Sequence, residues 1–224
     1  MRSSRRALPV LALFAALLLS ACSGSDKGGG TSGSSTPADT VVSVTGITEV
    51  DRLITAVDRH DSITMAALTG YQKLACKTNI PNPGLGDPPL CRGDETDGQM
   101  VEVLPATQCL GSWVRPEQVP PAYDDALGPS PELYAVLVPR QRPGAFGSGF
   151  GVQYVIVLKT GTKANGSPVG LGLHVAGGRI LWLEKQCDSI QQFVGPDQVQ
   201  SYVRAPSGAA TPSAARSPAA SSTP

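Results

Sequence analysis

The chain has 224 residues, in which 18 Lys and Arg balance 18 Asp and Glu, and this length suits one globular domain with flanking segments. The neutral balance excludes the basic face that nucleic-acid binding needs, so no nucleic acid is expected as a partner. Only two His are present, which disfavours His-rich metal sites, and we expect neither a metal nor a cofactor. Gly and Pro together make up about a fifth of the chain, against ~12% in average proteins.

The amino-terminal segment has the features of an export signal. Three Arg precede an apolar stretch over residues 7–19, which is shorter than the ~20 residues of a membrane-spanning helix. The stretch ends in Leu-Ser-Ala-Cys, which resembles the lipobox of bacterial lipoproteins. The resemblance implies removal of residues 1–21 as a signal peptide and attachment of acyl chains, palmitate among them, to Cys22. An ordinary secretory signal with a chance Cys is the alternative.

Two segments of low complexity flank the predicted globular domain, residues 41–205. Residues 22–40 are rich in Gly and Ser and predict a flexible tether. Residues 206–224 are rich in Ala, Ser and Pro and predict a disordered tail, with a wall-spanning stalk as the alternative. Because the three Arg of the signal are lost, the mature chain is slightly acidic, and the acyl chains alone should hold it at the membrane.

The domain begins with two predicted helices. Residues 47–57 carry apolar side chains at helical spacing. Thr48 is the expected N-cap, with Asp51 three residues later, and Asp51 is expected on the solvated face of this helix. A second short helix is predicted over residues 63–70, with Ile63 facing inward.

After the second helix the apolar pattern changes to period two, which predicts about six strands. They are expected over residues 71–78, 100–104, 132–138, 152–159, 169–175 and 179–185. A Pro/Gly-rich loop over residues 79–98 separates the first two strands, and a helix is predicted over residues 116–127. This order favours an α+β fold in which amino-terminal helices pack on a curved antiparallel sheet.

The last two strands carry the clearest turn signal in the chain. The pair Gly177–Gly178 predicts a two-residue type I′ turn, because both positions of that turn need a positive φ. The register then pairs Val175 with Ile180 and Leu173 with Trp182. Both faces of the hairpin carry apolar residues, so we expect it to be central in the sheet and covered on both sides.

Four Cys remain besides Cys22, and an even number in an exported domain predicts two disulfides. The preferred pairing is Cys76–Cys91 with Cys109–Cys187. The first bridge would close the Pro/Gly loop, and the second would tie the last strand to the middle of the chain. All three pairings stay open, and a zinc site is the alternative, although the spacing C-x₂-C is lacking.

Three further motifs carry little chemistry. The Gly-rich residues 144–151 lack the Lys and Ser/Thr of a phosphate-binding loop and predict a mobile hairpin loop. Three acidic residues within 94–97 supply only part of the oxygen ligands that Ca²⁺ needs, so a solvated loop is expected. Residues 165–167 match a glycosylation sequon, for which a turn is the better explanation.

The candidate ligand-binding residues are Trp182, Glu184 and His174. In the predicted register Trp182 and Glu184 share one face of the hairpin, and His174 lies on the other. A carboxylate at the end of an otherwise apolar face suits a binding pocket. A strand end that reaches solvent is the alternative interpretation.

Helices followed by a bent antiparallel sheet over residues 45–185 resemble the NTF2-like, cone-shaped fold. In that family a helix packs on the concave face of the sheet and leaves a pocket that serves enzymes, small-ligand binders and interaction modules. With few catalytic groups in the chain, we expect a lipid-anchored, extracytoplasmic binding or interaction module of the cell envelope. Its partners would be the membrane, through Cys22, and an unknown small ligand or envelope protein. The alternative is an enzyme on this scaffold that uses His174 or Glu184 as acid or base.

Overall fold

A computed structural model describes residues 43–81, 83–108, 111–141, 148–186 and 188–207. The predicted signal peptide, the predicted tether with Cys22 and nearly all of the predicted tail lie outside these residues, so the predicted domain boundaries stay predictions. Within the described part of the chain, no helix combines the length and the apolar composition needed to cross a membrane.

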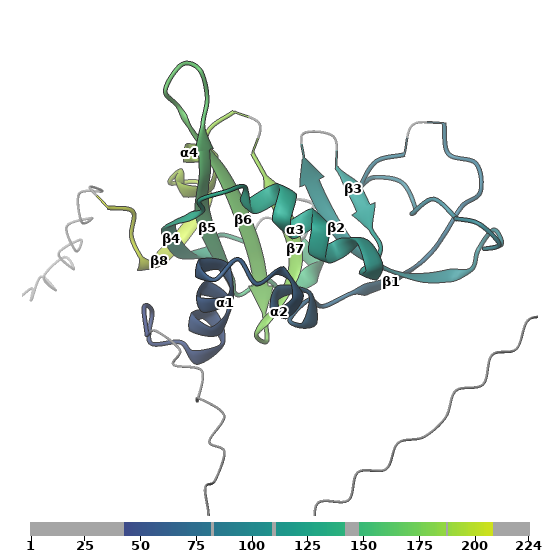
Figure 1. Ribbon diagram of the computed structural model, residues 1–224, viewed down its shortest axis with the longest axis horizontal. Coiled ribbons are helices and arrows are strands. Elements are labelled where there is room, and N and C mark those ends of the chain that lie inside the picture. Colours follow the sequence, from purple (N-terminus) through teal and green to yellow (C-terminus); the bar gives the residue numbers. More distant parts are fainter. Residues whose placement is uncertain (1–42, 82, 109–110, 142–147, 187, 208–224) are drawn as a thin grey trace, which may run out of the picture. The chain divides into compact units, whose positions relative to one another are not determined.

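The fold is α+β (Figure 1), as the order of helices and strands predicted. The α-helices among the described residues are α1 (Thr48–Asp58), α2 (Ser62–Ala67), α3 (Val119–Leu127) and α4 (Gln191–Val194). The strands are β1 (Gln72–Ala75), β2 (Met100–Gln108), β3 (Ser112–Val114), β4 (Glu132–Pro139), β5 (Tyr154–Thr162), β6 (Pro168–Ala176), β7 (Arg179–Lys185) and β8 (Val199–Arg204). Short 3₁₀ turns cover Pro116–Gln118 and Ser148–Phe150.

The sheet differs from the predicted one in size and in pairing. It has eight strands in the order β1-β2-β7-β6-β5-β4-β8, with β3 also paired to β2. Every pair is antiparallel except β2 with β7, which is parallel, so the sheet is mixed. Strands β3 and β8 were not predicted, because three residues are too few to show period two and β8 alternates weakly. Only α1 and α2 precede the strands, so the helices are not all amino-terminal.

Strand β2 is longer than the sequence predicts because it continues through Pro105. A proline lacks the N–H that a strand donates, so it argues for a strand end. Here Met100 to Val103 pair with β1, whereas Leu104 to Ala106 pair with β3. Pro105 therefore lies where β2 exchanges one antiparallel partner for another, and the strand goes on to pair with β7.

Helices α1, α2 and α3 cover one face of the sheet (Figure 1), and their apolar residues form the main core with it. Helix α1 contributes Leu53 and Val57, and α2 contributes Met65, all fully or almost fully buried. Ile63, expected to face inward, is 69% exposed. Helix α2 has only six residues, so its inner face has room for little more than Met65.

Asp51 was expected on the solvated face of α1 but is buried. Its carboxylate accepts hydrogen bonds from Thr45 N at 2.8 Å, from Thr45 Oγ1 at 2.7 Å and from Gly46 N at 3.2 Å. It therefore anchors the segment before the helix, while the N-cap residue is Ile47 instead of the expected Thr48. Burial raises the pKa of the Asp51 carboxyl, but the hydrogen bonds to its ionised form outweigh burial and leave that pKa below the ordinary 3.8.

The Cys76–Cys91 disulfide is present, with a Cα–Cα distance of 5.0 Å, and it closes the Pro/Gly loop as predicted. Cys109 and Cys187 lie outside the described residues. The described residues directly before them are Gln108 and Gln186, and Gln108 forms the last pair of the parallel β2–β7 ladder with Lys185, which precedes Gln186. The two chain segments that lead into Cys109 and Cys187 therefore leave the sheet side by side, which supports the second predicted bridge.

We predict that Asp51→Asn lowers the free energy of unfolding by about 1–2 kcal/mol at neutral pH, because the carboxylate loses its hydrogen bonds. The folded pKa lies below the unfolded value, so this stabilisation is complete above about pH 4 and is lost as pH falls through the folded pKa. Urea denaturation at neutral and acidic pH should show the two proteins converging in acid. Asp58→Asn, at an exposed acid of the same helix, is the control, and a wild-type advantage that does not change with pH would contradict the prediction.

We predict that full reduction of the purified mature chain raises its intact mass by about 4 Da, two hydrogens for each of two bridges. Each bridge should stabilise the fold by about 2–4 kcal/mol, mainly by restricting the unfolded chain. A rise of about 2 Da would mean a single bridge and would reject the prediction of two.

Candidate functional site

The β6–β7 hairpin positions all three candidate ligand-binding residues. Its turn is formed as predicted, with a φ of 54° at Gly177 and of 71° at Gly178. The predicted pairing of Val175 with Ile180 is also confirmed. These four residues form the turn and the first pair of the hairpin, and the hairpin lies at the centre of the sheet.

Beyond Ile180 the register differs from the predicted one by one residue. A β-bulge places His174, and not Leu173, opposite Trp182, and it places Leu173 opposite Leu183. A shift of one residue in the pairing register moves every side chain of a strand to the other face of the sheet. Trp182 and Glu184 therefore lie on the same face as His174, and the prediction that separated them was wrong.

The chain segment after α2 holds the start of β7 where the bulge begins. Ile180 N donates to Leu68 O at 2.9 Å, and Gly70 N donates to Ile180 O at 2.8 Å. The Leu181 side chain lies against Gly70 so closely that a Cβ there would be 2.6 Å from Leu181 Cδ2. Contacts from residues over a hundred positions earlier thus hold Ile180 and Leu181, which explains why hairpin geometry alone did not predict the bulge.

His174 and Glu184 form a short hydrogen-bonded pair. The distance from His174 Nε2 to Glu184 Oε2 is 2.6 Å, and Gln186 Nε2 donates to the other carboxylate oxygen at 2.5 Å. The two side chains are largely buried, with 10% of His174 and 19% of Glu184 exposed. An ionised carboxylate only accepts, so Nε2 carries the proton of this bond, and in the neutral tautomer with that proton Nδ1 is an acceptor.

Trp182 fixes the plane of the His174 ring. The two rings stack with centroids 3.9 Å apart and an interplanar angle of 22°. The indole Nε1 donates to Thr107 Oγ1 at 3.0 Å, and Thr107 Oγ1 donates to Leu183 O at 3.3 Å. Strand β2 supplies Thr107 through its parallel pairing with β7, and no sequence signal pointed to this residue.

A pocket of about 290 Å³ opens beside the His174–Glu184 pair. Its apolar lining residues are Leu137, Pro139, Val155 and Phe193, and its polar ones are His174, Glu184, Gln186, Gln192 and Gln198. Among the described residues, none hydrogen-bonds to His174 Nδ1. The pocket is therefore lined by one imidazole ring, one carboxylate, three amides and four apolar side chains, and Trp182, which is not part of this lining, stacks on the His174 ring.

Helix α4 forms one wall of this pocket, on the sheet face opposite α1, α2 and α3. It packs directly on β6 because the residues beneath it are glycines. A Cβ at Gly172 would lie 2.5 Å from Phe193 Cε1, and one at Gly170 would lie 2.9 Å from Ile190 Cα. The predicted site between the amino-terminal helix and the sheet is thus not where the pocket lies.

The acidic loop is held by its own neighbours. Asp97 accepts from Thr78 N at 3.0 Å and from Lys77 Nζ at 3.1 Å, and these bonds lower the pKa of its carboxyl. Glu95 pairs with the buried Arg115 at 2.7 Å. Two of the three acids in this motif therefore bind residues that follow β1 and β3, which agrees with the expected loop.

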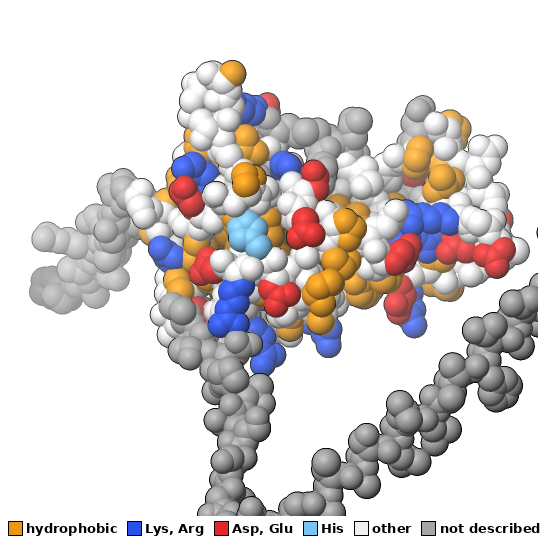
Figure 2. All heavy atoms as spheres, in the orientation of Figure 1, with side chains coloured by type: hydrophobic (Ala, Val, Ile, Leu, Met, Phe, Trp, Pro, Cys, Tyr) orange, Lys and Arg blue, Asp and Glu red, His pale blue; other side chains and the backbone are white. Residues whose placement is uncertain are grey.

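Figure 2 shows acidic and basic side chains next to one another over the end of the molecule that carries this loop. The ion pairs there include Arg92 with Glu117 at 3.1 Å and Arg115 with Glu95. Charges of opposite sign that lie this close largely cancel, so these two pairs contribute little net field for attracting a charged partner.

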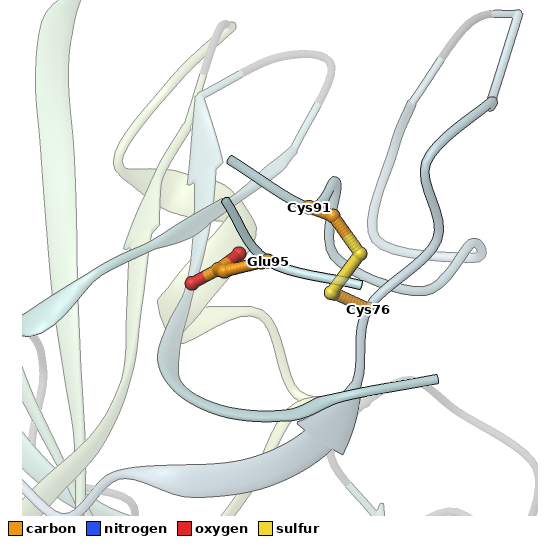
Figure 3. Close-up of side chains that lie close together, drawn as sticks. All are labelled: Cys76, Cys91 and Glu95. Carbon is orange, nitrogen blue, oxygen red and sulfur yellow. A yellow bond between two sulfur atoms is a disulfide. The ribbon is translucent and has the colours of Figure 1, made fainter. Parts of the chain in front are cut away.

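The sulfur atoms of Cys76 and Cys91 lie within 4.8 Å of a Glu95 carboxylate oxygen, an arrangement that Figure 3 shows in close-up. Metal binding by Cys needs the thiolate. The two sulfurs are bonded to each other, so they are not thiolates, and the zinc alternative finds no support at this position.

The remaining motifs agree with their simpler interpretations where the structure describes them. Within the Gly-rich segment 144–151, Phe150 packs against the cluster that contains Phe193, whereas residues 144–147 lie outside the described residues, so the predicted mobile loop stays a prediction. Asn165 Oδ1 accepts from Ser167 N at 3.0 Å, and Gly166 has a φ of 82°. Residues 165–167 therefore form the predicted turn, between β5 and β6.

Comparison of the chain with protein-family models, with curated proteins and with solved structures found no match. The resemblances to a bacterial lipoprotein and to the NTF2-like fold stay predictions, and the pocket has to be interpreted from its own residues.

We predict that Gly172→Ala lowers the free energy of unfolding by about 1–3 kcal/mol, because the new methyl group overlaps the Phe193 ring. Gly161→Ala is the matched control, since it lies in β5 with open space around its Cβ position. Urea denaturation measures both variants. Adding Phe193→Leu should recover part of the loss, and equal stability of the two glycine variants would contradict the packing of α4 on β6.

Proposed function

We propose that this protein is a lipid-anchored, extracytoplasmic binding module of the cell envelope, and that its pocket on β6, β7 and α4 takes a small ligand. The single observation that carries the ligand-binding part is the buried His174–Glu184 pair at the pocket. The anchoring part rests on the lipobox that ends at Cys22, followed by the Gly/Ser-rich tether.

The chemistry of the pocket suits binding. Small-molecule sites combine an apolar lining with a few fixed polar groups. Here stacking on Trp182 and the hydrogen bond to Glu184 fix the His174 ring, and Thr107 in turn holds Trp182. The His174 ring is therefore already held in one position, so little side-chain entropy is lost when a ligand binds to its Nδ1.

An enzyme is the second candidate, favoured by the same pair. A carboxylate that orients a histidine is the usual arrangement of a general base, with the free ring nitrogen taking the proton. In that function His174 Nδ1 would accept a proton from a substrate or a water molecule, and Glu184 would hold the ring. The pocket lining supplies neither Ser nor Cys as a nucleophile, so binding is the function that the described residues support better.

One experiment tests both parts of the proposal. The full chain, produced in cells that make it naturally, is extracted from membranes with detergent and analysed by native mass spectrometry. We expect a mass that lacks residues 1–21, carries acyl chains, and includes a co-purified ligand. Cys22→Ser should lose the acyl chains and move to the aqueous phase, whereas Glu184→Ala should keep them and lose the ligand.

The two variants separate the two parts of the proposal. An unprocessed chain that partitions into water would overturn the anchoring. A co-purified ligand that survives Glu184→Ala unchanged would place binding elsewhere. Turnover of a substrate that disappears in His174→Ala would favour the enzyme.

A further inference from the structure

The ionisable groups that line the pocket are hydrogen-bonded to each other. None of its nine lining residues is Lys or Arg, and the two ionisable ones are His174 and Glu184. Glu184 directs one oxygen to His174 and the other to Gln186. An anionic ligand would meet a carboxylate with no cation to balance it, and such a pairing is unfavourable in a partly buried site.

The remaining polar groups of the pocket are amides. Gln186 lies beside Glu184, and Gln192 and Gln198 come from exposed positions on or after α4. Gln192 Nε2 donates one hydrogen to Asp188 Oδ2 at 3.1 Å, which leaves its second hydrogen and its oxygen for a ligand. Each amide has an oxygen that accepts and a nitrogen that donates two hydrogens. A hydroxyl group also both donates and accepts, so a ligand with several hydroxyls can satisfy this set without carrying a charge.

The apolar lining residues and the volume of the pocket restrict the chemical class of the ligand further. Leu137, Val155 and the Phe193 ring offer surfaces for C–H groups. The volume of about 290 Å³ lies at the lower end of small-molecule sites, which begin at about 300 Å³. This favours a ligand of one or two sugar rings over a long chain or a peptide.

We infer that the pocket binds an uncharged, hydroxyl-rich small molecule of monosaccharide to disaccharide size. The inference rests on the proposed function. In it, His174 Nδ1 accepts from one ligand hydroxyl, the glutamine amides bind neighbouring hydroxyls, and the apolar face of the ligand lies on Phe193.

The fluorescence of Trp182 can report binding next to the pocket. The chain has two Trp, and Trp113 lies on β3, where its Nε1 donates to Asp87 O. Trp113→Phe in the mature chain therefore leaves Trp182, stacked on His174, as the only indole. D-glucose, N-acetyl-D-glucosamine, myo-inositol and trehalose form the neutral set of probes. Glucuronate and glucose 6-phosphate form the anionic set, and glucosamine is the cationic probe.

We expect a saturable change in Trp182 fluorescence with at least one neutral probe, and binding of its anionic counterpart weaker by about tenfold or more. Gln192→Ala and Gln198→Ala should each weaken the neutral probe about three- to tenfold. Gln191→Ala is the matched control, because this exposed amide on α4 bonds to Tyr134 and does not line the pocket. It should bind like the parent.

Three outcomes would overturn the inference. Saturable binding of an anionic or cationic probe in preference to the neutral one would show that the ligand is charged. That result would contradict the inferred ligand class and leave the proposed function in place. Binding that Gln191→Ala weakens as much as Gln192→Ala would place the ligand outside the pocket. No response to any neutral probe would reject the hydroxyl-rich ligand, whereas the proposed function would still stand or fall on the ligand that co-purifies with the native protein.

Discussion

The hydrogen bonds between β7 and its two neighbours are the constraint on which the rest of the structure depends. On one side β7 forms a hairpin with β6 through Gly177 and Gly178, and on the other it runs parallel to β2. The segment after α2 also binds the start of β7 at Ile180. These partners together impose the bulge, and the bulge brings His174, Trp182 and Glu184 to one face.

The two faces of the sheet serve different purposes because they are covered differently. Helices α1, α2 and α3 cover one face completely and form the main core. On the opposite face, the described cover includes the short helix α4 and its flanking residues, which pack on Gly170 and Gly172, together with Phe150 and Val152. Incomplete cover leaves room for a pocket, and a polar pair that would be costly in the main core can lie there at the edge of solvent.

The disulfide loop and the pocket are stabilised in different ways. The loop lacks apolar periodicity, so a disulfide, ion pairs and hydrogen bonds from acidic residues hold it in place of a core. His174 and Glu184 instead lie on β6 and β7, strands that each pair with a neighbour on both sides. Their positions are therefore set by the sheet, which is the kind of support that a preformed binding site needs.

The sequence by itself determined much of the local structure. Helical spacing located α1, period two located six of the strands, and Gly177–Gly178 predicted both the turn and the pairing of Val175 with Ile180. The Cys76–Cys91 bridge followed from the position of two cysteines around a loop without apolar pattern. These features depend on residues that are close along the chain, so the local pattern of residue types is enough to predict them.

Only the tertiary structure decided which residues form the candidate site. The parallel pairing of β2 with β7 brings Thr107 to Trp182 across 75 positions, and it has no local signal. The bulge exchanged the faces of Trp182 and Glu184 because distant backbone groups, those of Leu68 and Gly70, bind Ile180. The burial of Asp51 likewise depends on how the preceding segment folds back over α1. Periodicity describes one strand or helix at a time, whereas register and burial depend on the free energy of contacts between elements that are far apart in sequence.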